Sequence, residues 1–172
     1  AGRTLDGTYY WQVMAEDNAG NKSNWSNLEK VTIDTKEPSK PEILKFLNPN
    51  LTCGSVTNSN IVTVDWSDSS DENGSGIKGY EYQVNYPTTT GGRSVWTYML
   101  QGTSSYFRGS LNEGTHYIRV RAQDMAGNWS EWSDKWVDPS NLTEEEMEGN
   151  CSITYDSIGP VVTLTSPEDN YY

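Results

Sequence analysis

The sequence predicts an all-β protein built from tandem β-sandwich domains, one complete and two partial. Hydrophobic residues make up only 34% of the 172 residues, yet the chain holds 7 tryptophans and 11 tyrosines, residues in which disordered chains are poor. Apolar and polar residues alternate over short stretches bounded by glycine, asparagine and proline, which is typical of half-buried strands joined by turns. The third observation is an internal repeat about the length of one sandwich domain.

The internal repeat relates segments that lie 107 residues apart. Residues 7–26 align with residues 114–133 without a gap, and 12 of the 20 aligned pairs are identical. A second match relates residues 31–38 to residues 153–160, now 122 residues apart. The larger spacing indicates an acidic insertion at about residues 135–150, which is expected to form a solvated loop or a single helical turn.

These repeats set the expected domain boundaries. Residues 1–35 are expected to be the C-terminal strands of a first sandwich, residues 36–158 a complete domain, and residues 159–172 the first strand of a following repeat. A chain divided in this way is expected to belong to a longer polypeptide, or to have its partial domains completed by strands from neighbouring subunits.

Within the complete domain, the alternation of apolar residues predicts the strands in order. They are expected at residues 41–47, 61–66, 77–86, 93–100, 104–107 and 116–123, with a last strand after the turn at residues 124–128. Two faces stand out as the predicted core: Val62, Val64 and Trp66 on the second strand, and Ile118, Val120 and Ala122 on the sixth.

The residues around Trp66 and the run at residues 111–122 resemble a fibronectin type III domain. The phrases at residues 32–35, 74–82 and 124–128 are similar, more narrowly, to the tandem fibronectin-like or immunoglobulin-like repeats of prokaryotic extracellular surface proteins. This resemblance covers nearly the whole chain. It implies a stalk, adhesin, surface-layer or filament component, whose partners are neighbouring repeats, subunits of the same assembly, or a cell-surface glycan or protein.

Charge and motifs exclude several other classes of protein. A formal net charge of −12 repels phosphate backbones, so nucleic acid is not expected as a partner. No apolar run is long enough to span a bilayer, so membrane insertion of this segment is not expected. The lone histidine, His116, aligns with Tyr9 in the repeat and suits packing better than catalysis. We therefore expect no enzymatic activity, and Ca²⁺ is the only cofactor that the sequence suggests.

A rival interpretation comes from residues 129–133, whose Trp-Ser-Glu-Trp-Ser sequence matches the box of class I cytokine receptors. Arg119 and Arg121 stand where that family stacks arginines between tryptophan rings, here those of Trp129 and Trp132. We interpret these residues as a Trp-Arg ladder that stiffens an exposed sheet, because the other repeat has glutamine and methionine in place of the arginines. A cytokine-receptor-like ligand-binding module is the alternative.

A carbohydrate-binding module is a further alternative. Trp96, Trp129, Trp136 or Tyr98 offers a ring on which a sugar could stack. Such a module would bind glycans without acting on them.

Two features are typical of a secreted protein. Cys53 lies between the first two predicted strands and Cys151 opens the last, so a disulfide would tie the first and last segments of the domain together. Two separate buried thiols are the alternative. Among several Asn-x-Ser/Thr sequences, Asn50 and Asn141 are the best candidates for glycosylation. An extracellular location at a cell surface is therefore expected.

The sharpest expectation about a site is a calcium site at one pole of the complete domain. The loop after the second strand carries Asp68, Asp71 and Asn73, and sandwich topology places this loop near Asp124 and near the entering linker at Asp34. Oxygen ligands that converge from three segments suit Ca²⁺. Bound Ca²⁺ would stiffen the joint between domains, and a solvated acidic turn is the alternative.

Overall fold

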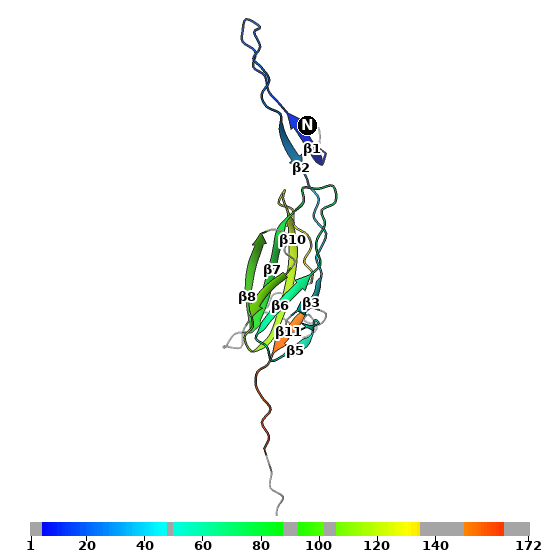
Figure 1. Ribbon diagram of the computed structural model, residues 1–172, viewed down its shortest axis with the longest axis vertical. Helices are drawn as coiled ribbons and strands as arrows, with labels where there is room; N and C mark the ends of the chain where they lie inside the picture. The colour runs from blue at the N-terminus through cyan, green and yellow to red at the C-terminus, as the bar shows by residue number, and fades with distance from the viewer. Residues whose placement is uncertain (1–4, 48–49, 88–92, 102–105, 135–149, 164–172) are drawn as a thin grey trace, which may run out of the picture.

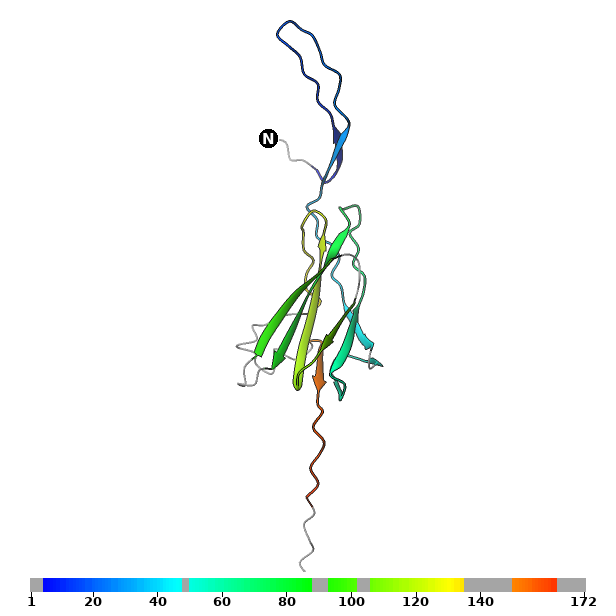
Figure 2. The same cartoon turned by 60° about the vertical axis from the view of Figure 1, so that its left-hand side comes forward.

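In the computed structural model the chain is elongated, with a β-hairpin at one end, a β-sandwich in the middle and an extended segment after the last strand (Figure 1). The structure describes residues 5–47, 50–87, 93–101, 106–134 and 150–163. The hairpin leaves one end of the sandwich and the extended segment leaves the opposite end (Figure 2). The parts of this chain before and after the sandwich are therefore attached at its two opposite ends.

The hairpin consists of β1 (Gly7–Trp11) and β2 (Glu29–Ile33), which pair antiparallel in a sheet of their own. Beyond the strands the two arms stay paired, since the N–H of Ser26 donates to the carbonyl of Val13 at 2.8 Å. A two-stranded sheet alone is marginally stable in water. The apolar side chains of the hairpin have no second layer among the described residues.

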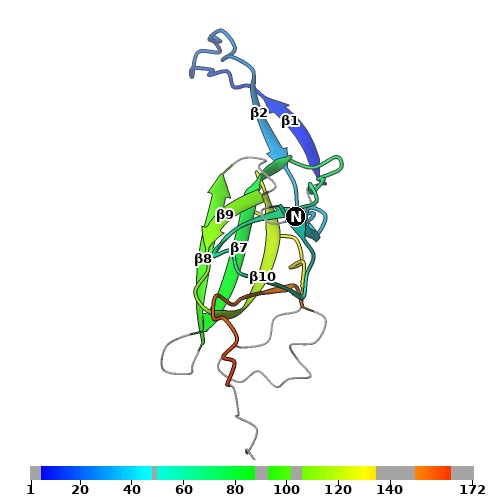
Figure 3. The ribbon, with the colours of Figure 1, turned by 60° about the horizontal axis from the view of Figure 1, so that its bottom comes forward.

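The sandwich consists of two sheets. The four-stranded sheet, in the order β4-β3-β6-β9, comprises β3 (Ile43–Leu47), β4 (Asn50–Leu51), β6 (Ile61–Trp66) and β9 (Tyr106–Ser110). The five-stranded sheet, in the order β5-β11-β10-β7-β8, comprises β5 (Ser55–Thr57), β7 (Ile77–Pro87), β8 (Arg93–Gln101), β10 (Gly114–Asp124) and β11 (Ser152–Tyr155). Only β5 and β11 pair in parallel among these strands. Figure 3 shows β8, β7 and β10 side by side in the larger sheet.

The core lies between the two sheets and is built from alternate residues of their strands. β6 contributes Val62, Val64 and Trp66, and β10 contributes Ile118, Val120 and Ala122, each at most 1% exposed. The ring of Tyr80 on β7 meets that of Trp66 edge-on, with centroids 5.7 Å apart. Both predicted core faces are therefore confirmed, and the all-β sandwich with them.

The strands follow the predicted order, with some differences in extent. The strand expected at residues 104–107 is β9, Tyr106–Ser110, because its pairing with β6 sets its bounds. The sequence does not predict β4 and β5, which are too short to show an alternation. The expected last strand is in two parts: residues 129–133 run beside β10, and β11 lies along the same edge of β10 further on.

The predicted acidic insertion falls between these two parts of the last strand. Residues 135–149, which make up nearly all of it, lie outside the described residues.

Within the described part of the chain, no helix combines the length and apolarity that crossing a membrane requires.

Candidate functional site

The hairpin joins the sandwich at Asp34, the residue directly after β2. Its Oδ1 accepts a hydrogen bond from the N–H of Lys36 at 3.1 Å, and its Oδ2 accepts one from the N–H of Ser75 at 2.7 Å. Ser75 belongs to the loop between β6 and β7, so this carboxylate bonds the linker to the sandwich. The hydrogen bonds from Lys36 and Ser75 lower the pKa of Asp34 below the ordinary value for aspartate. The contact therefore contributes at neutral pH and is lost as the pH falls through that lowered pKa.

The turn after β10 forms the other side of the joint. Asp124 Oδ1 accepts hydrogen bonds from the N–H of Gly127 at 2.6 Å and of Asn128 at 2.8 Å. Gly127 has a φ of +101°, a conformation that glycine adopts most readily. Asn128 Nδ2 donates both to Asp124 Oδ2 at 2.7 Å and to the carbonyl of Asp34 at 3.1 Å. The turn therefore holds the backbone of Asp34, while the loop before β7 holds its carboxylate.

Asp71 supplies a third carboxylate from the loop between β6 and β7. Its Oδ2 accepts a hydrogen bond from the N–H of Gly76 at 2.7 Å. A Cβ atom at Gly74 would lie 2.1 Å from Asp71 Oδ1, so the carboxylate occupies the space that a side chain at position 74 would need. Glycine at position 74 is therefore what allows this position of Asp71.

Asp34, Asp71 and Asp124 together form what we call the Asp cluster, in which one carboxylate oxygen from each residue lies within 4.8 Å of the others. These are three of the five predicted metal ligands. Asp68 and Asn73 are exposed, and the carboxylate of Asp68 is not part of the cluster. In the part of the chain that the structure describes, no lysine or arginine forms an ion pair with the cluster. The carboxylates are held by N–H donors, and their oxygens are of the type that Ca²⁺ takes.

A ladder of tryptophan and arginine side chains lies on the outer face of β10. The guanidinium of Arg121 contacts the rings of Trp129 and Trp132, at 4.1 and 4.5 Å from their centroids. The guanidinium of Arg119 lies 4.1 Å from the centroid of the Trp132 ring. Desolvation, and then the neighbouring Arg121, lower the pKa of Arg119 to about 10, so Arg119 stays charged at neutral pH. Each contact is a cation–π interaction.

The two arginines also pair with β7, through residues that the sequence does not identify. Arg121 Nε and Nη2 lie 2.7 and 2.6 Å from Glu81 Oε2. Arg119 Nε and Nη2 donate to Gln83 Oε1 at 2.9 and 2.6 Å. The register of β10 and β7 places Arg121 opposite Glu81 and Arg119 opposite Gln83. These partners follow from the register, which the structure shows and the sequence alone does not set.

The serines of the Trp-Ser-Glu-Trp-Ser sequence hold residues 129–133 to β10. Ser130 Oγ accepts a hydrogen bond from the N–H of Ala122 at 2.9 Å, and Ser133 Oγ accepts one from the N–H of Val120 at 3.1 Å. The N–H groups of the same serines donate to the carbonyls of Ala122 and Val120 at 3.0 and 2.8 Å. The motif thus combines serines that bond to the sheet with tryptophans that stack on its arginines.

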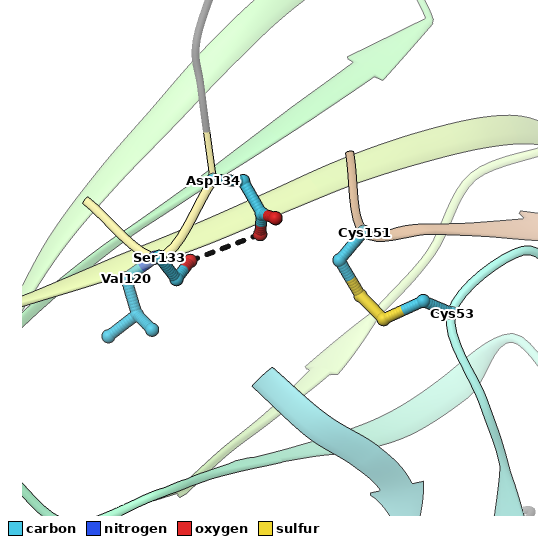
Figure 4. Close-up of a disulfide and its surroundings, with 5 residues drawn as sticks. All are labelled: Cys53, Val120, Ser133, Asp134 and Cys151. Atoms are coloured by element: carbon cyan, nitrogen blue, oxygen red, sulfur yellow. Dashed lines mark hydrogen bonds between the residues drawn. A yellow bond between two sulfur atoms is a disulfide. The ribbon is translucent and has the colours of Figure 1, made fainter. Parts of the chain in front are cut away.

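Cys53 and Cys151 form a disulfide (Figure 4), which confirms the predicted pairing over the alternative of separate thiols. Cys53 precedes β5 and Cys151 precedes β11, and their Cα atoms are 4.8 Å apart. Beside the disulfide, the N–H of Gly54 donates to the carbonyl of Ser152 at 2.8 Å. The bond links the first part of the domain to its last strand.

Of the predicted sugar-stacking rings, only that of Trp129 can be placed among the described side chains. Trp129 is already stacked on Arg121. Trp96 and Tyr98 belong to β8, and Trp136 lies outside the described residues. The carbohydrate-binding alternative therefore stays a prediction.

Three other residues named from the sequence are Asn50, Asn141 and His116. Asn50 is exposed in β4, which leaves its glycosylation a prediction, and Asn141 lies outside the described residues. His116 is 1% exposed, and its Nε2 lies 2.7 Å from the carbonyl oxygen of Asn112. This burial matches the packing role expected for His116.

The hairpin reproduces the last strands of the sandwich at the level of single contacts. The hydroxyl groups of Thr8 and Thr32 lie 3.1 Å apart, and those of their counterparts Thr115 and Thr154 lie 2.9 Å apart. In the turn at residues 17–21, the aspartate accepts hydrogen bonds from the asparagine N–H and Nδ2 at 2.9 Å each, as in the turn after β10. The sequence repeat is therefore also a repeat in structure.

The chain is similar to a small part of one longer curated protein and to parts of solved structures. No protein-family model matches it. Over 157 residues, 91% of its length, the chain is 32% identical to Exoglucanase B of Cellulomonas fimi, and it spans 13% of that protein. Solved structures similar to it include the fibronectin(III)-like modules of Clostridium thermocellum CbhA, at 18% identity and a TM-score of 0.45 over 88% of this chain and 64% of that one. Another is the sixth fibronectin type III domain of human fibronectin type III domain containing protein 3, at 20% identity and a TM-score of 0.36 over 75% of this chain and 96% of that one.

Proposed function

Because the described residues form a fibronectin type III-like sandwich, we propose that the chain is a non-catalytic spacing module of a longer extracellular protein. It holds the domains before and after it at a set distance. The setting is a stalk, adhesin, surface-layer or filament protein, as the sequence predicts, or a secreted glucan-degrading enzyme, as the similarity to a small part of Exoglucanase B suggests. The disulfide supports the extracellular location, since such bonds persist in oxidising compartments.

The observation that carries this proposal is the joint at Asp34. β2 ends at Ile33, and the next residue is already bonded to two loops of the sandwich. Thr35 Oγ1 also donates to Asp6 Oδ1 at 2.9 Å, so the linker is bonded to the hairpin as well. A linker bonded on both sides is not a flexible tether. Such a joint supports a fixed direction from one module to the next.

The hairpin itself supports a tandem arrangement. Its inward side chains Tyr9, Trp11, Val13 and Val31 are 40%, 51%, 58% and 46% exposed. Their counterparts in the sandwich, His116, Ile118, Val120 and Ile153, are at most 1% exposed. We infer that the hairpin is the end of an earlier sandwich, whose other strands cover this face. Burying four such side chains stabilises a domain by about 1.5–3 kcal/mol each.

Replacing Asp34 with alanine is expected to loosen the joint while the sandwich stays folded. Loss of the carboxylate leaves the N–H of Ser75 without its acceptor. We expect hydrogen exchange at the Ser75 amide to rise about tenfold, the scale of one charge-assisted hydrogen bond. We also expect relaxation of ¹⁵N nuclei in the hairpin to report motion independent of the sandwich. Asp156→Ala is the matched control, because Asp156 occupies the equivalent position after β11 and is exposed. Equal behaviour of the hairpin in both variants would contradict the spacing function.

We also propose that the Asp cluster binds Ca²⁺ and stiffens the joint. Three carboxylates from three segments, with no ion-paired lysine or arginine among the described residues, support this proposal. The second expected result is a rise in melting temperature with added CaCl₂ that EDTA reverses. A hundredfold excess of Ca²⁺ over its Kd would stabilise the fold by about 2.7 kcal/mol.

Two variants separate this calcium site from general screening of acidic charge. Asp71→Asn alters a member of the Asp cluster, and Asp68→Asn alters an exposed residue outside it. We expect the Ca²⁺-dependent shift to disappear in the first variant and to persist in the second. A shift that survives Asp71→Asn, or no EDTA-sensitive shift in the natural chain, would dismiss the site.

A further inference from the structure

The linker after β11 repeats the linker after β2. Asp156 lies 122 residues after Asp34 and makes the same local turn: its Oδ1 accepts a hydrogen bond from the N–H of Ile158 at 2.9 Å. In the first linker, Asp34 Oδ1 accepts from the N–H of Lys36 at 3.1 Å. Both aspartates therefore have their carboxylates set in the same way relative to the chain.

The contact on the preceding strands is repeated too. In the first linker, Thr35 Oγ1 donates to Asp6, which lies just before β1. In the second, Ser157 Oγ donates to Glu113, which lies just before β10, and the N–H of Ser157 lies 3.2 Å from Glu113 Oε1. Each linker is thus tied back to the module that it leaves.

The two linkers differ in their contacts with the module that follows them in the chain. Asp34 is 8% exposed, because the loop before β7 and the turn after β10 close over it. Asp156 is exposed, and the residues after it, Ile158, Val161 and Val162, are 74%, 89% and 80% exposed. The carboxylate of Asp156 therefore has the same local geometry as that of Asp34, but no loop of a neighbouring sandwich covers it among the described residues.

We propose that Asp156 is the docking residue of a second joint, and that its partner is the pole of another sandwich module of this kind. This inference rests on the spacing function proposed above. The partner must supply a backbone N–H for the second carboxylate oxygen, as Ser75 does for Asp34. It must also supply an Asp-x-x-x-Asn turn whose asparagine amide donates to the carbonyl of Asp156, as Asn128 donates to the carbonyl of Asp34. Backbone and amide N–H groups recognise the carboxylate and carbonyl here, and a cationic side chain is not required.

A tandem protein tests this proposal directly. Residues 1–158 are followed by residues 37–172, which keeps the natural linker length and places the pole of the second copy after Asp156. We expect both sandwiches to share one alignment tensor in residual dipolar couplings, and the Ser75 amide of the second copy to be protected from hydrogen exchange. Asp156→Ala should raise exchange at that amide about tenfold and separate the tensors, while Asp34→Ala in the first copy should affect only the first joint. The proposal would be overturned if the two sandwiches had separate alignment tensors with Asp156 intact. It would also be overturned if the Asp156→Ala tandem showed the same tensors and the same Ser75 exchange as the parent tandem.

A second test uses the natural chain and does not depend on the folding of an added module. The double substitution T35S/K36I gives the first linker the Asp-Ser-Ile sequence of the second. We expect the Ser75 amide to keep its protection within about threefold, and Asp34→Ala on this background to remove it. Loss of protection in T35S/K36I alone would show that the second linker cannot form the joint. Because the joint of the unaltered chain is measured separately, this result would leave the spacing function standing and remove only the second joint.

Discussion

Replacing both Cys53 and Cys151 with alanine is expected to lower the free energy of unfolding by about 4–5 kcal/mol. The disulfide joins residues 98 positions apart, so its removal frees a long loop in the unfolded chain. In the chain-entropy account, the stabilisation grows with the length of that loop. Domains of this size are stable by about 5–15 kcal/mol, so the variant loses a large part of its stability. Urea unfolding followed by tryptophan fluorescence measures the loss.

Reduction of the natural chain provides the control for this variant. Alanine also removes the packing of Cys151, which is 4% exposed, whereas reduction removes only the bond. We expect the reduced chain to lose slightly less stability than the double alanine variant. A loss below about 1 kcal/mol in both would mean that the unfolded chain holds these segments together without the bond.

The repeat and the alternation of apolar residues made most of the fold predictable from the sequence. Two aligned copies identify which residues recur at fixed spacing, and within each copy alternation separates the inward from the outward face. Ile118, Val120 and Ala122 illustrate this, since all three lie in a repeated segment and in the core as predicted. The short strands β4 and β5 could not be predicted, because two or three residues show no period and their pairing depends on tertiary contacts.

The Asp cluster was predictable at the level of segments but not of every side chain. Sandwich topology brings the linker, the loop after β6 and the turn after β10 to one pole, and so brings Asp34, Asp71 and Asp124 together. Which residues of the loop after β6 face the pole depends on its turn, in which Asn73 has a φ of 61°. That backbone geometry is not visible in the sequence, which therefore does not show that Asp71 joins the cluster and Asp68 does not.

The partners of the Trp-Arg ladder show the same limit. The tryptophans and arginines carry a recognisable spacing along the chain, whereas Glu81 and Gln83 lie about 40 positions earlier. Their pairing depends on the register between β7 and β10, which shifts at Gln123/Asp124. Register across two strands depends on both faces of a sheet and on the turns that join them, so it emerges only from the fold.

Replacing Arg121 with methionine, the residue at the matching position of the first repeat, is expected to cost about 3 kcal/mol of stability. Glu81 is 7% exposed and would keep a buried charge without its guanidinium partner. Trp129 and Trp132 would also lose the cation between their rings. Urea unfolding measures this loss, and Arg119→Met serves as the comparison. Arg119 pairs with the neutral Gln83, so its replacement is expected to cost about 1 kcal/mol.

The double variant Glu81→Met/Arg121→Met separates the two causes of that loss. If the unpaired charge of Glu81 dominates, replacing both partners restores stability to within about 1 kcal/mol of the natural chain, because a buried ion pair contributes little over an apolar pair of similar volume. If the stacking of Arg121 on the tryptophans dominates, the double variant stays as unstable as Arg121→Met alone. We expect the first outcome, since the Arg121 Nη2 to Glu81 Oε2 distance is 2.6 Å and the Glu81 side chain is only 10% exposed.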